Sequence, residues 1–382
     1  MGEHPDSPVL WLRFDPEMKI LSSIYLHQPD YQWQYQLRHE RDVIAQLQAL
    51  ERLAEFPSPQ TRQIIANTIE SSSCFFRVRC SACYALAEIS NKIAHTLTGL
   101  PGLISIFQRM FGSNSAPSIV KANDFSDFQA YFIQSTMPKA ISVLRNSSGA
   151  CPAEVQDFLL NLIHYNYNKD NKFSDDWYRS NMVAALGSTI TPTVSTHYSR
   201  AFTSSSQDAV YDIQKTAAEI ILQLNMDRLL PSYKHVVTVS CLRALSQLAA
   251  CGHMKPDPLF FLSYTEPDSF WDVRLAAVDC LAEHVKNQQD FEVLLILLEK
   301  IELDADPHFK YQVALSLVRN PPFSFGVSQA DQSLNVATLA ETLWSLITTK
   351  FPHDAKLRCL LMDLYYMLYG RDQPSCLQPG AV

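Results

Sequence analysis

The sequence predicts an all-α fold, a HEAT-like α-solenoid of the ARM/HEAT superhelix class. Glycine is scarce, at 10 of 382 residues, where a typical protein has roughly 7%. Few glycines with many Leu, Ala and Gln residues favour helices over tight β-turns. The apolar share of 47% is enough for a folded core. The 21 prolines are expected between helices, because inside a helix each costs about 3 kcal/mol.

A repeated motif is the strongest indication of this fold. The stretch "FWDVRLAAVDCLAEHV" (270–285) has an apolar residue, a base, and then small or apolar residues three or four apart. Similar stretches surround Arg79, Arg179, Thr238, Lys310 and Arg358. Steps of 36 residues lead from Thr238 to Arg274 and on to Lys310, and 48 more to Arg358. One such match is an ordinary amphipathic helix, but six with periods near 40 are typical of HEAT-type arrays.

The residue types in the motif suit stacked helix pairs. Small residues such as Ala82, Ala85, Ala277 and Cys280 let neighbouring helices approach, while Leu86 and Leu281 fill grooves. No pair buries its apolar face alone, so neighbouring pairs must stack.

Residues 1–28 are predicted to be a β-hairpin that ends a truncated β-sandwich domain. Apolar and other side chains alternate in "VLWLRF" (9–14), "DPE" (15–17) signals a turn, and "ILSSIYL" (20–26) reads as a second strand. A lone hairpin is marginal in water. It therefore either packs on the first helices or ends a β-domain that the chain lacks. The second alternative is favoured, so the chain is expected to be a fragment or a shortened product.

The remaining chain divides into two halves of a solenoid. Residues 29–190 form the first half, 191–207 a flexible Ser/Thr-rich insertion, 208–371 the second half, and 372–382 a disordered tail. The first half is expected to begin with one long helix over 33–56. Ser58 then caps a helix with Pro59 at its first position, and a later helix is expected to break before Pro138.

No constellation of residues predicts chemistry. Cys80 and Cys83 form a CxxC inside a predicted helix, without a second Cys or His pair nearby, so they are expected to be core cysteines. The sequence has no HExxH, no GxSxG and no glycine-rich phosphate loop. Asp175 and Asp176 are expected to cap a helix. The histidines stand apart: His39, His164, His235, His284 and His308. We therefore predict no catalytic, cofactor-binding or metal-binding residues. No cofactor is expected, and the protein is not expected to be an enzyme.

Two sets of residues leave alternatives open. The bases of the repeats are Arg79, Arg179, Arg274, Lys310 and Arg358. They form either a nucleic-acid stripe or pairs within the chain, with acids such as Asp272 or with carbonyls between repeats. The net charge of −8 favours internal pairing. The clustered aromatics either anchor a partner or, by default, staple helix ends; they are Tyr31, Trp33, Tyr35, Trp177 and Tyr178. Partner-binding residues stay unassigned.

The sequence also indicates a compartment. It contains no window of 18 apolar residues, so no transmembrane helix is expected. "MGEHPDSPVL" lacks the basic and apolar regions of a secretory signal. Nine scattered cysteines suit reduced residues in the nucleus or cytosol.

Several long strings carry a resemblance to a known family. They are "SPVLWLRFDPEMKIL", "WQYQLRHERDVIAQLQAL", "CFFRVRCSACYALAEI", "NKFSDDWYRSNMVAAL", "LLPSYKHVVTVSCLRAL" and "LRCLLMDLYYMLYG". In this order, from about residue 7 to residue 371, they resemble the C-terminal half of the aminopeptidase-like subunits of the general transcription factor TFIID, numbered two among the TATA-binding-protein-associated factors.

The resemblance implies a fold and a function. Members of this family share the domain arrangement of M1 zinc aminopeptidases without the working zinc site, with a β-sandwich before the helical repeats. They help TFIID recognise core-promoter DNA and dock against other subunits. We therefore expect a non-catalytic nuclear scaffold that docks to TFIID subunits and supports core-promoter recognition and assembly of the RNA polymerase II preinitiation complex. Promoter DNA is a possible partner of the full-length protein and doubtful for this chain; no membrane or small-molecule partner is expected. The alternatives are the C-terminal helical domain of an active M1 aminopeptidase, or another adaptor solenoid.

Overall fold

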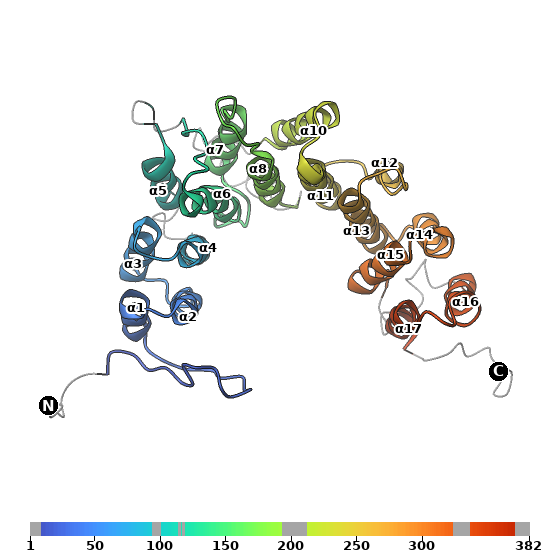
Figure 1. Cartoon of the computed structure of the whole chain (residues 1–382), viewed down its shortest axis with the longest axis horizontal. Helices are drawn as coiled ribbons and strands as arrows, with labels where there is room; N and C mark the ends of the chain where they lie inside the picture. The colour runs from blue at the N-terminus through green and yellow to red at the C-terminus, as the bar shows by residue number, and fades with distance from the viewer. Residues whose placement is uncertain are drawn as a thin grey trace. The chain divides into compact units, whose positions relative to one another are not determined.

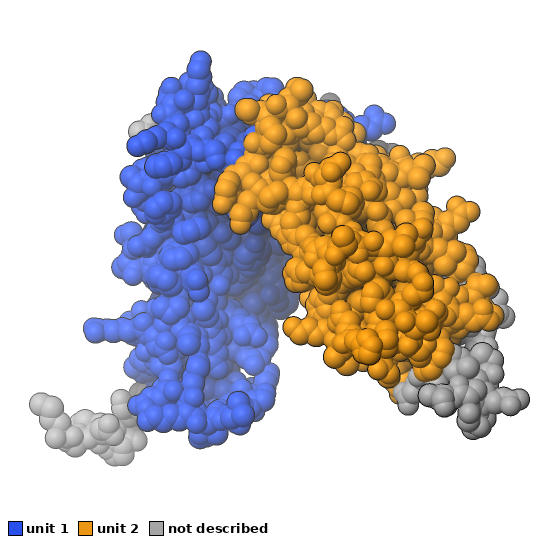
Figure 2. Space-filling model, turned by 45° about the vertical axis from the view of Figure 1, so that its right-hand side comes forward, with its two compact units in different colours: residues 1–219 blue, residues 220–382 orange. Residues whose placement is uncertain are grey.

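The computed structural model describes residues 9–93, 101–113, 116, 119–192, 212–323 and 337–370. The chain divides into two compact units, residues 1–219 and residues 220–382, which Figure 2 shows in blue and orange. The boundary between the units falls within helix α10 (Ile213–Leu229). Apart from one isolated bridge between Gly112 and Val120, the described residues contain helices, turns and extended segments without a β-strand.

Unit 1 is a stack of antiparallel helix pairs (Figure 1). The helices are α1 (Asp30–His39), α2 (Val43–Leu53), α3 (Pro59–Glu70), α4 (Phe76–Lys92), α5 (Pro101–Phe111), α6 (Phe128–Ser142), α7 (Ala153–His164) and α8 (Asp176–Thr189). Each odd-numbered helix packs on the even-numbered helix that follows it. The helices α2, α4, α6 and α8 pack on one another in chain order and form one layer.

Unit 2 repeats this arrangement. After the short turn η2 (Tyr233–His235), it contains α11 (Val236–Ala250), α12 (Pro258–Ser263), α13 (Trp271–Gln288), α14 (Phe291–Leu303), α15 (Pro307–Arg319), α16 (Ala337–Ser345), the π-helical turn η4 (Leu346–Lys350) and α17 (Ala355–Tyr369). The helices α11, α13, α15 and α17 form one layer, and α12, α14 and α16 each pack on the helix that follows. In both units, the first set is called the inner layer below and the other helices the outer layer.

The sequence repeat coincides with the inner layers. Thr238, Arg274, Lys310 and Arg358 lie in α11, α13, α15 and α17, which contact one another consecutively. Arg79 and Arg179 lie in α4 and α8, with α6 between these two helices. The predicted array of helix pairs is therefore confirmed.

Small side chains line the helix contacts as expected. Ala82, Ala277 and Cys280 are buried at the contacts between inner helices, and Leu86 and Leu281 are buried beside them. Burying a leucine side chain stabilises the fold by about 2 kcal/mol, but only the neighbouring pair supplies the surface that covers it.

Three of the basic residues in the first turns of inner helices bind carbonyls at the end of an outer helix or just after it. The Arg79 Nε donates to the Ile69 carbonyl at 2.8 Å, the Arg274 Nε to the Thr265 carbonyl at 3.0 Å, and the Lys310 Nζ to the Glu302 carbonyl at 3.1 Å. The last four carbonyls of a helix have no partner within it, and this end carries partial negative charge. Internal pairing is thus confirmed for these three bases.

Arg274 makes the most extensive of these contacts. Its guanidinium also pairs with Asp304 at 2.6 Å and lies 3.7 Å from the centre of the Phe309 ring. Both charged side chains are at most a tenth exposed. Asp272, which the sequence suggested as an acidic partner of these bases, lies in the first turn of α13. The acid that pairs with Arg274 is Asp304. Of the two remaining bases, Arg179 lies 3.9 Å from Asp176, and Arg358 donates to the Pro352 carbonyl at 3.5 Å.

The predicted β-hairpin over residues 1–28 is wrong for the described part, residues 9–28. A turn is present, since the Met18 N–H donates to the Asp15 carbonyl at 3.0 Å, but no strand flanks it. The side chain of Gln28 takes the place of a partner strand: its Oε1 accepts from the Leu12 N–H at 2.9 Å and its Nε2 donates to the Leu12 carbonyl at 3.1 Å. Arg13 also pairs with Glu40 at 3.4 Å. The segment therefore packs on the first helices, the alternative that was not favoured.

Two predicted helix boundaries are also wrong. Residues 33–56 do not form one helix, because α1 ends at His39 and α2 begins at Val43. Asp42 is the N-cap of α2, and its side chain accepts from the Ile44 N–H at 3.1 Å. Pro138 lies inside α6 without a break; packing of α6 between α4 and α8 offsets its cost. The cap at Ser58 is confirmed, since its hydroxyl accepts from the Thr61 N–H at 3.1 Å.

The domain boundaries within the helical region stay predictions. The insertion at 191–207 lies outside the described residues except for residues 191–192, and the tail at 372–382 lies entirely outside them.

We predict that Arg274→Ala destabilises unit 2 by about 3 kcal/mol, because Asp304 would remain buried without its cation. Urea denaturation followed by helical circular dichroism measures this loss. The matched control is Arg243→Ala, whose side chain is exposed on α11 and should change stability by less than about 0.5 kcal/mol. An equal effect of both changes would contradict the role assigned to Arg274.

Candidate docking surfaces

The dispersed histidines make local contacts. His39 stacks on Tyr35 with ring centres 5.7 Å apart, and His308 stacks on Trp271 at 5.1 Å. His284 Nε2 lies 3.2 Å from Asp290. His164 packs edge-on against Tyr165, and His235 packs against Phe270 with the two rings tilted. In the part of the chain that the structure describes, no three His, Cys, Asp or Glu side chains gather as metal ligands would.

The CxxC residues diverge within the helical packing. The Cys83 thiol is fully buried in α4 and donates to the Arg79 carbonyl at 3.2 Å. The Cys80 thiol points to α6, where it donates to the Phe132 carbonyl at 3.8 Å. Burial raises the pKa of both thiols.

Asp175 and Asp176 begin α8 as expected, but Asp175 makes no capping hydrogen bond. Its carboxylate instead accepts from the Asn166 side chain at 2.5 Å.

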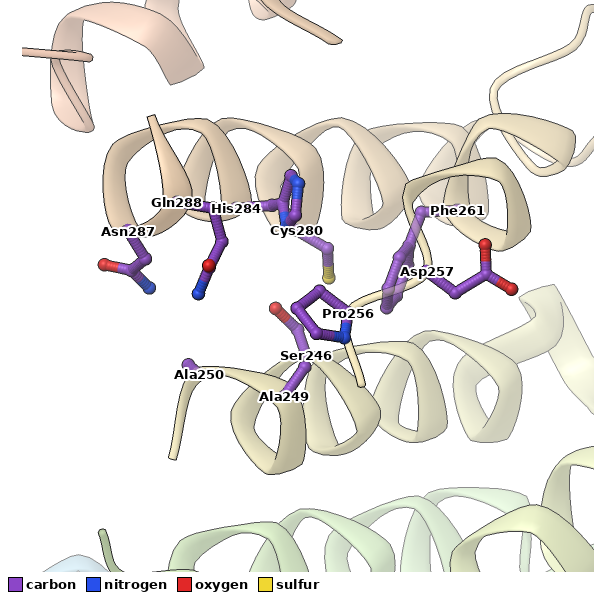
Figure 3. A pocket seen from close by; sticks show the side chains of 10 residues that line it. All are labelled: Ser246, Ala249, Ala250, Pro256, Asp257, Phe261, Cys280, His284, Asn287 and Gln288. Carbon is purple, nitrogen blue, oxygen red and sulfur yellow. The ribbon is translucent and has the colours of Figure 1, made fainter. Parts of the chain in front are cut away.

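A narrow pocket lies between α11, α13 and the loop before α12 (Figure 3). Its volume of about 20 Å³ is room for one water molecule. Cys280 and His284 both line it from α13. Burial raises the pKa of the Cys280 thiol to about 12, and this thiol donates to the Leu242 carbonyl at 3.7 Å. A thiol held protonated, beside a histidine that faces Asp290, lacks the properties of an activated nucleophile.

Unit 1 carries a line of contacting aromatic rings, here called the aromatic row. Its members, in order of contact, are Phe75, Phe76, Phe132, Tyr131, Phe125 and Phe173. Successive ring centres lie 4.7–6.1 Å apart. The rings come from the starts of α4 and α6 and from the segments before α6 and α8. Phe75, Phe132 and Phe173 are exposed, so the row presents an apolar edge to solvent.

The five aromatics named from the sequence separate into two groups. Trp33 and Tyr178 are buried in the core, whereas Tyr31, Tyr35 and Trp177 are exposed. None of the five belongs to the aromatic row. The sequence analysis did not identify the row because it joins residues from separate segments. Its signal in the sequence is the aromatic residues just before or at the start of α4, α6 and α8.

Unit 2 contains a larger, apolar groove, here called the α10–α12 groove. Its volume is about 300 Å³, at the lower end of the usual range for binding sites, roughly 300–1,000 Å³. The floor is formed by Leu224, Leu245 and Phe261, which are buried. Its other lining residues are Ile221, Asn225, Arg228, Ala249, Met254, Lys255, Asp257 and Phe260.

The sequence did not single out this groove. Apolar residues occupy several faces of α10, so periodicity does not show which of them are buried. The side chains of Ile221, Leu222 and Met226 are 41%, 50% and 48% exposed, respectively, while Leu224 is 3% exposed. The signal available in the sequence was that α10 has more apolar residues than one packed helix face requires.

The fold and these surfaces define a class: a repeat protein of stacked helix pairs that exposes aromatic and apolar surface suited to binding other proteins. The chain belongs to the family described as "TAF2-like, TPR repeats", which matches residues 30–381. TPR arrays, like the predicted HEAT-like arrays, consist of stacked helix pairs. In the described residues, no helix is both long and apolar enough to cross a membrane.

The relatives agree with this family. The chain is 44% identical to transcription initiation factor TFIID subunit 2 of Drosophila melanogaster over 98% of its own length and 30% of that protein. It is 42% identical to the Gallus gallus subunit over 97% of its length and 31% of that protein, and 34% identical to the Caenorhabditis elegans subunit over 97% and 34%. The chain thus spans about a third of these relatives. The resemblance to TFIID subunit 2 is confirmed, and the alternative of an M1 aminopeptidase domain gains no support.

Buried thiols provide a test of the packing. We expect iodoacetamide at pH 8 to label the exposed Cys359 rapidly and to spare Cys151 and Cys280, because burial raises the pKa of both thiols to about 12. Mass spectrometry of labelled peptides measures this, and urea should abolish the difference.

The same thiols predict a pH dependence. The unfolded chain releases their protons near the ordinary pKa of 9.0, whereas the folded chain keeps them up to about pH 12. The free energy of unfolding should therefore fall as the pH rises through this window, and less steeply in Cys280→Ala. An identical slope in that variant would contradict the assignment.

Proposed function

We propose that this chain is a non-enzymatic docking scaffold of TFIID in the nucleus. It binds other TFIID subunits and so supports core-promoter recognition and assembly of the RNA polymerase II preinitiation complex. The observation that carries the proposal is identity of 34–44% to TFIID subunit 2 over nearly the whole chain. The stacked helix pairs support it, because such arrays offer long surfaces for partner segments.

The proposal assigns no catalysis to this chain, and two features of the described residues support it. The pocket beside Cys280 and His284 holds about one water molecule, and the thiol is held protonated. The α10–α12 groove has room for a ligand, but its floor consists of Leu224, Leu245 and Phe261, and the carboxylate of its lining, Asp257, already caps α12 by accepting from the Phe260 N–H.

Promoter DNA is not a direct partner of this chain in our proposal. Arg79, Arg274 and Lys310 hold carbonyls at helix ends, so these charges are not presented to phosphates. The net charge of −8 opposes approach to DNA.

We expect the affinity-tagged chain to co-isolate with TFIID subunits from nuclear extract, and an unrelated helical-repeat protein of similar size and charge to fail. Mass spectrometry identifies the captured subunits. Circular dichroism first establishes that the chain is folded. A folded chain that captures none of these subunits would refute the proposed function.

We expect no binding of a core-promoter duplex to the chain at about 10 µM and physiological salt, conditions in which many DNA-binding proteins bind even non-specifically. Fluorescence polarisation of labelled duplex measures this. Binding that weakens in Arg358→Glu would instead show that bases of the repeats contact DNA.

A further inference from the structure

We propose that the α10–α12 groove binds an amphipathic helix of another TFIID subunit, with apolar side chains in the groove and acidic residues beside Arg228 and Lys255. This inference rests on the proposed function and assigns it a site, a type of ligand and the contacts that select it. The groove lies wholly within unit 2, and its lining residues come from the C-terminal half of α10, from α11 and from the segment from Met254 to α12; Figure 1 labels these three helices.

The groove has a buried apolar floor and adaptable walls. Leu224, Leu245 and Phe261 form the floor, while Ile221 and Met254 are 41% and 36% exposed at its edges. Removing these edges from water is favourable in proportion to their apolar area. Methionine adapts its shape to the side chain that it meets, so the wall at Met254 suits an inserted apolar residue.

Apolar surface continues beside the groove. Leu222, Met226 and Leu229 follow one another at the i, i+4, i+7 spacing of one helix face, and Leu229 is 87% exposed. Contiguous exposed apolar surface of this kind marks interaction sites on soluble proteins. The surface is therefore longer than the groove alone and fits an elongated ligand.

The walls select a helix rather than an extended strand. A strand leaves backbone N–H and C=O groups that need partners from a sheet edge, and α10 and α12 already use their own backbone groups within helices. An α-helix satisfies its backbone internally and presents side chains at i, i+3, i+4 and i+7. A proline-rich segment would need a groove lined by several aromatic rings, and the aromatic residues among the described residues that line this groove are Phe260 and Phe261.

Charge at the rim specifies the polar side of the ligand. Arg228 is held there by two contacts with the Tyr264 hydroxyl, to which its Nε and Nη2 donate at 3.1 and 2.5 Å. Lys255 is exposed on the opposite segment. The one carboxylate at the rim, Asp257, accepts from the Phe260 N–H at 3.3 Å as the N-cap of α12. Two cations on a chain of net charge −8 favour acidic residues in the ligand.

The test uses synthetic peptides that tile the sequences of the other TFIID subunits, each labelled for fluorescence polarisation against the whole chain. We expect the bound peptides to have apolar residues at helical spacing with Asp or Glu on the adjacent face. A proline in the middle of a bound peptide should abolish binding, because it breaks the helix.

Variants of the chain locate the bound peptide. Ile221→Glu should weaken binding about tenfold or more, since it places a charge on the groove wall. The double variant Arg228→Glu and Lys255→Glu should weaken binding about tenfold at low salt and less at high salt. The matched control is Leu259→Glu, on α12 and 74% exposed but outside the groove lining, which should leave affinity within about twofold. Thermal melting verifies that every variant is folded.

Three outcomes overturn the inference: no tiled peptide binds, the bound peptides are proline-rich or basic, or Ile221→Glu binds them as well as the wild type. If the chain still co-isolates with TFIID subunits, the proposed function stands and only the groove is wrong. If co-isolation fails while peptides bind the groove as expected, the proposed function fails instead.

Discussion

The structure depends on a contact between a cation at the start of an inner helix and the open carbonyl end of an outer helix. Arg79, Arg274 and Lys310 make this contact in three separate pairs. In α3 and α14 the bound carbonyl belongs to the last turn of the outer helix, where no N–H of the same helix is available to it, and in the third pair it belongs to Thr265, just after α12. The cation satisfies one of these carbonyls and fixes where the outer helix ends relative to the inner one. The contact thereby helps to hold these three pairs together in addition to their apolar packing.

This use of cations determines what the surface offers to partners. Because Arg79, Arg274 and Lys310 bind carbonyls within the chain, the repeated bases contribute less positive charge to the exterior than their spacing in the sequence suggests. The exposed edges consist instead of aromatic rings beside α4 and α6 and apolar side chains beside α10. Such surfaces gain free energy by leaving water, which suits binding to other proteins better than binding to phosphates. The same internal contacts thus explain both the stability of the pairs and the kind of ligand that the units favour.

The sequence predicted the array because its determinants are local and repeated. Small residues such as Ala277 and Cys280, placed one helical turn apart after a base, have the same consequences in every copy. The errors concern places where a distant side chain decides the outcome. The extended backbone at Leu12 resembles a strand, but the amide of Gln28 binds it, and alternation of residue types contains no information about that bond. Pro138 signals a break locally, whereas the packing of α6 on two helices overrides the signal.

The docking surfaces were unpredictable for a related reason. Periodicity identifies which residues of a helix share a face, but the fraction of that face left uncovered depends on the length of the neighbouring helices. Since α12 has only six residues and packs on α13, the groove that it lines with α10 and α11 stays open beside Ile221 and Met254. A longer outer helix at this position would fill the groove with its own side chains. The shortness of α12 therefore leaves a candidate binding site at this position of unit 2. A ligand helix in the groove would occupy the part of the outer layer that α12 does not fill.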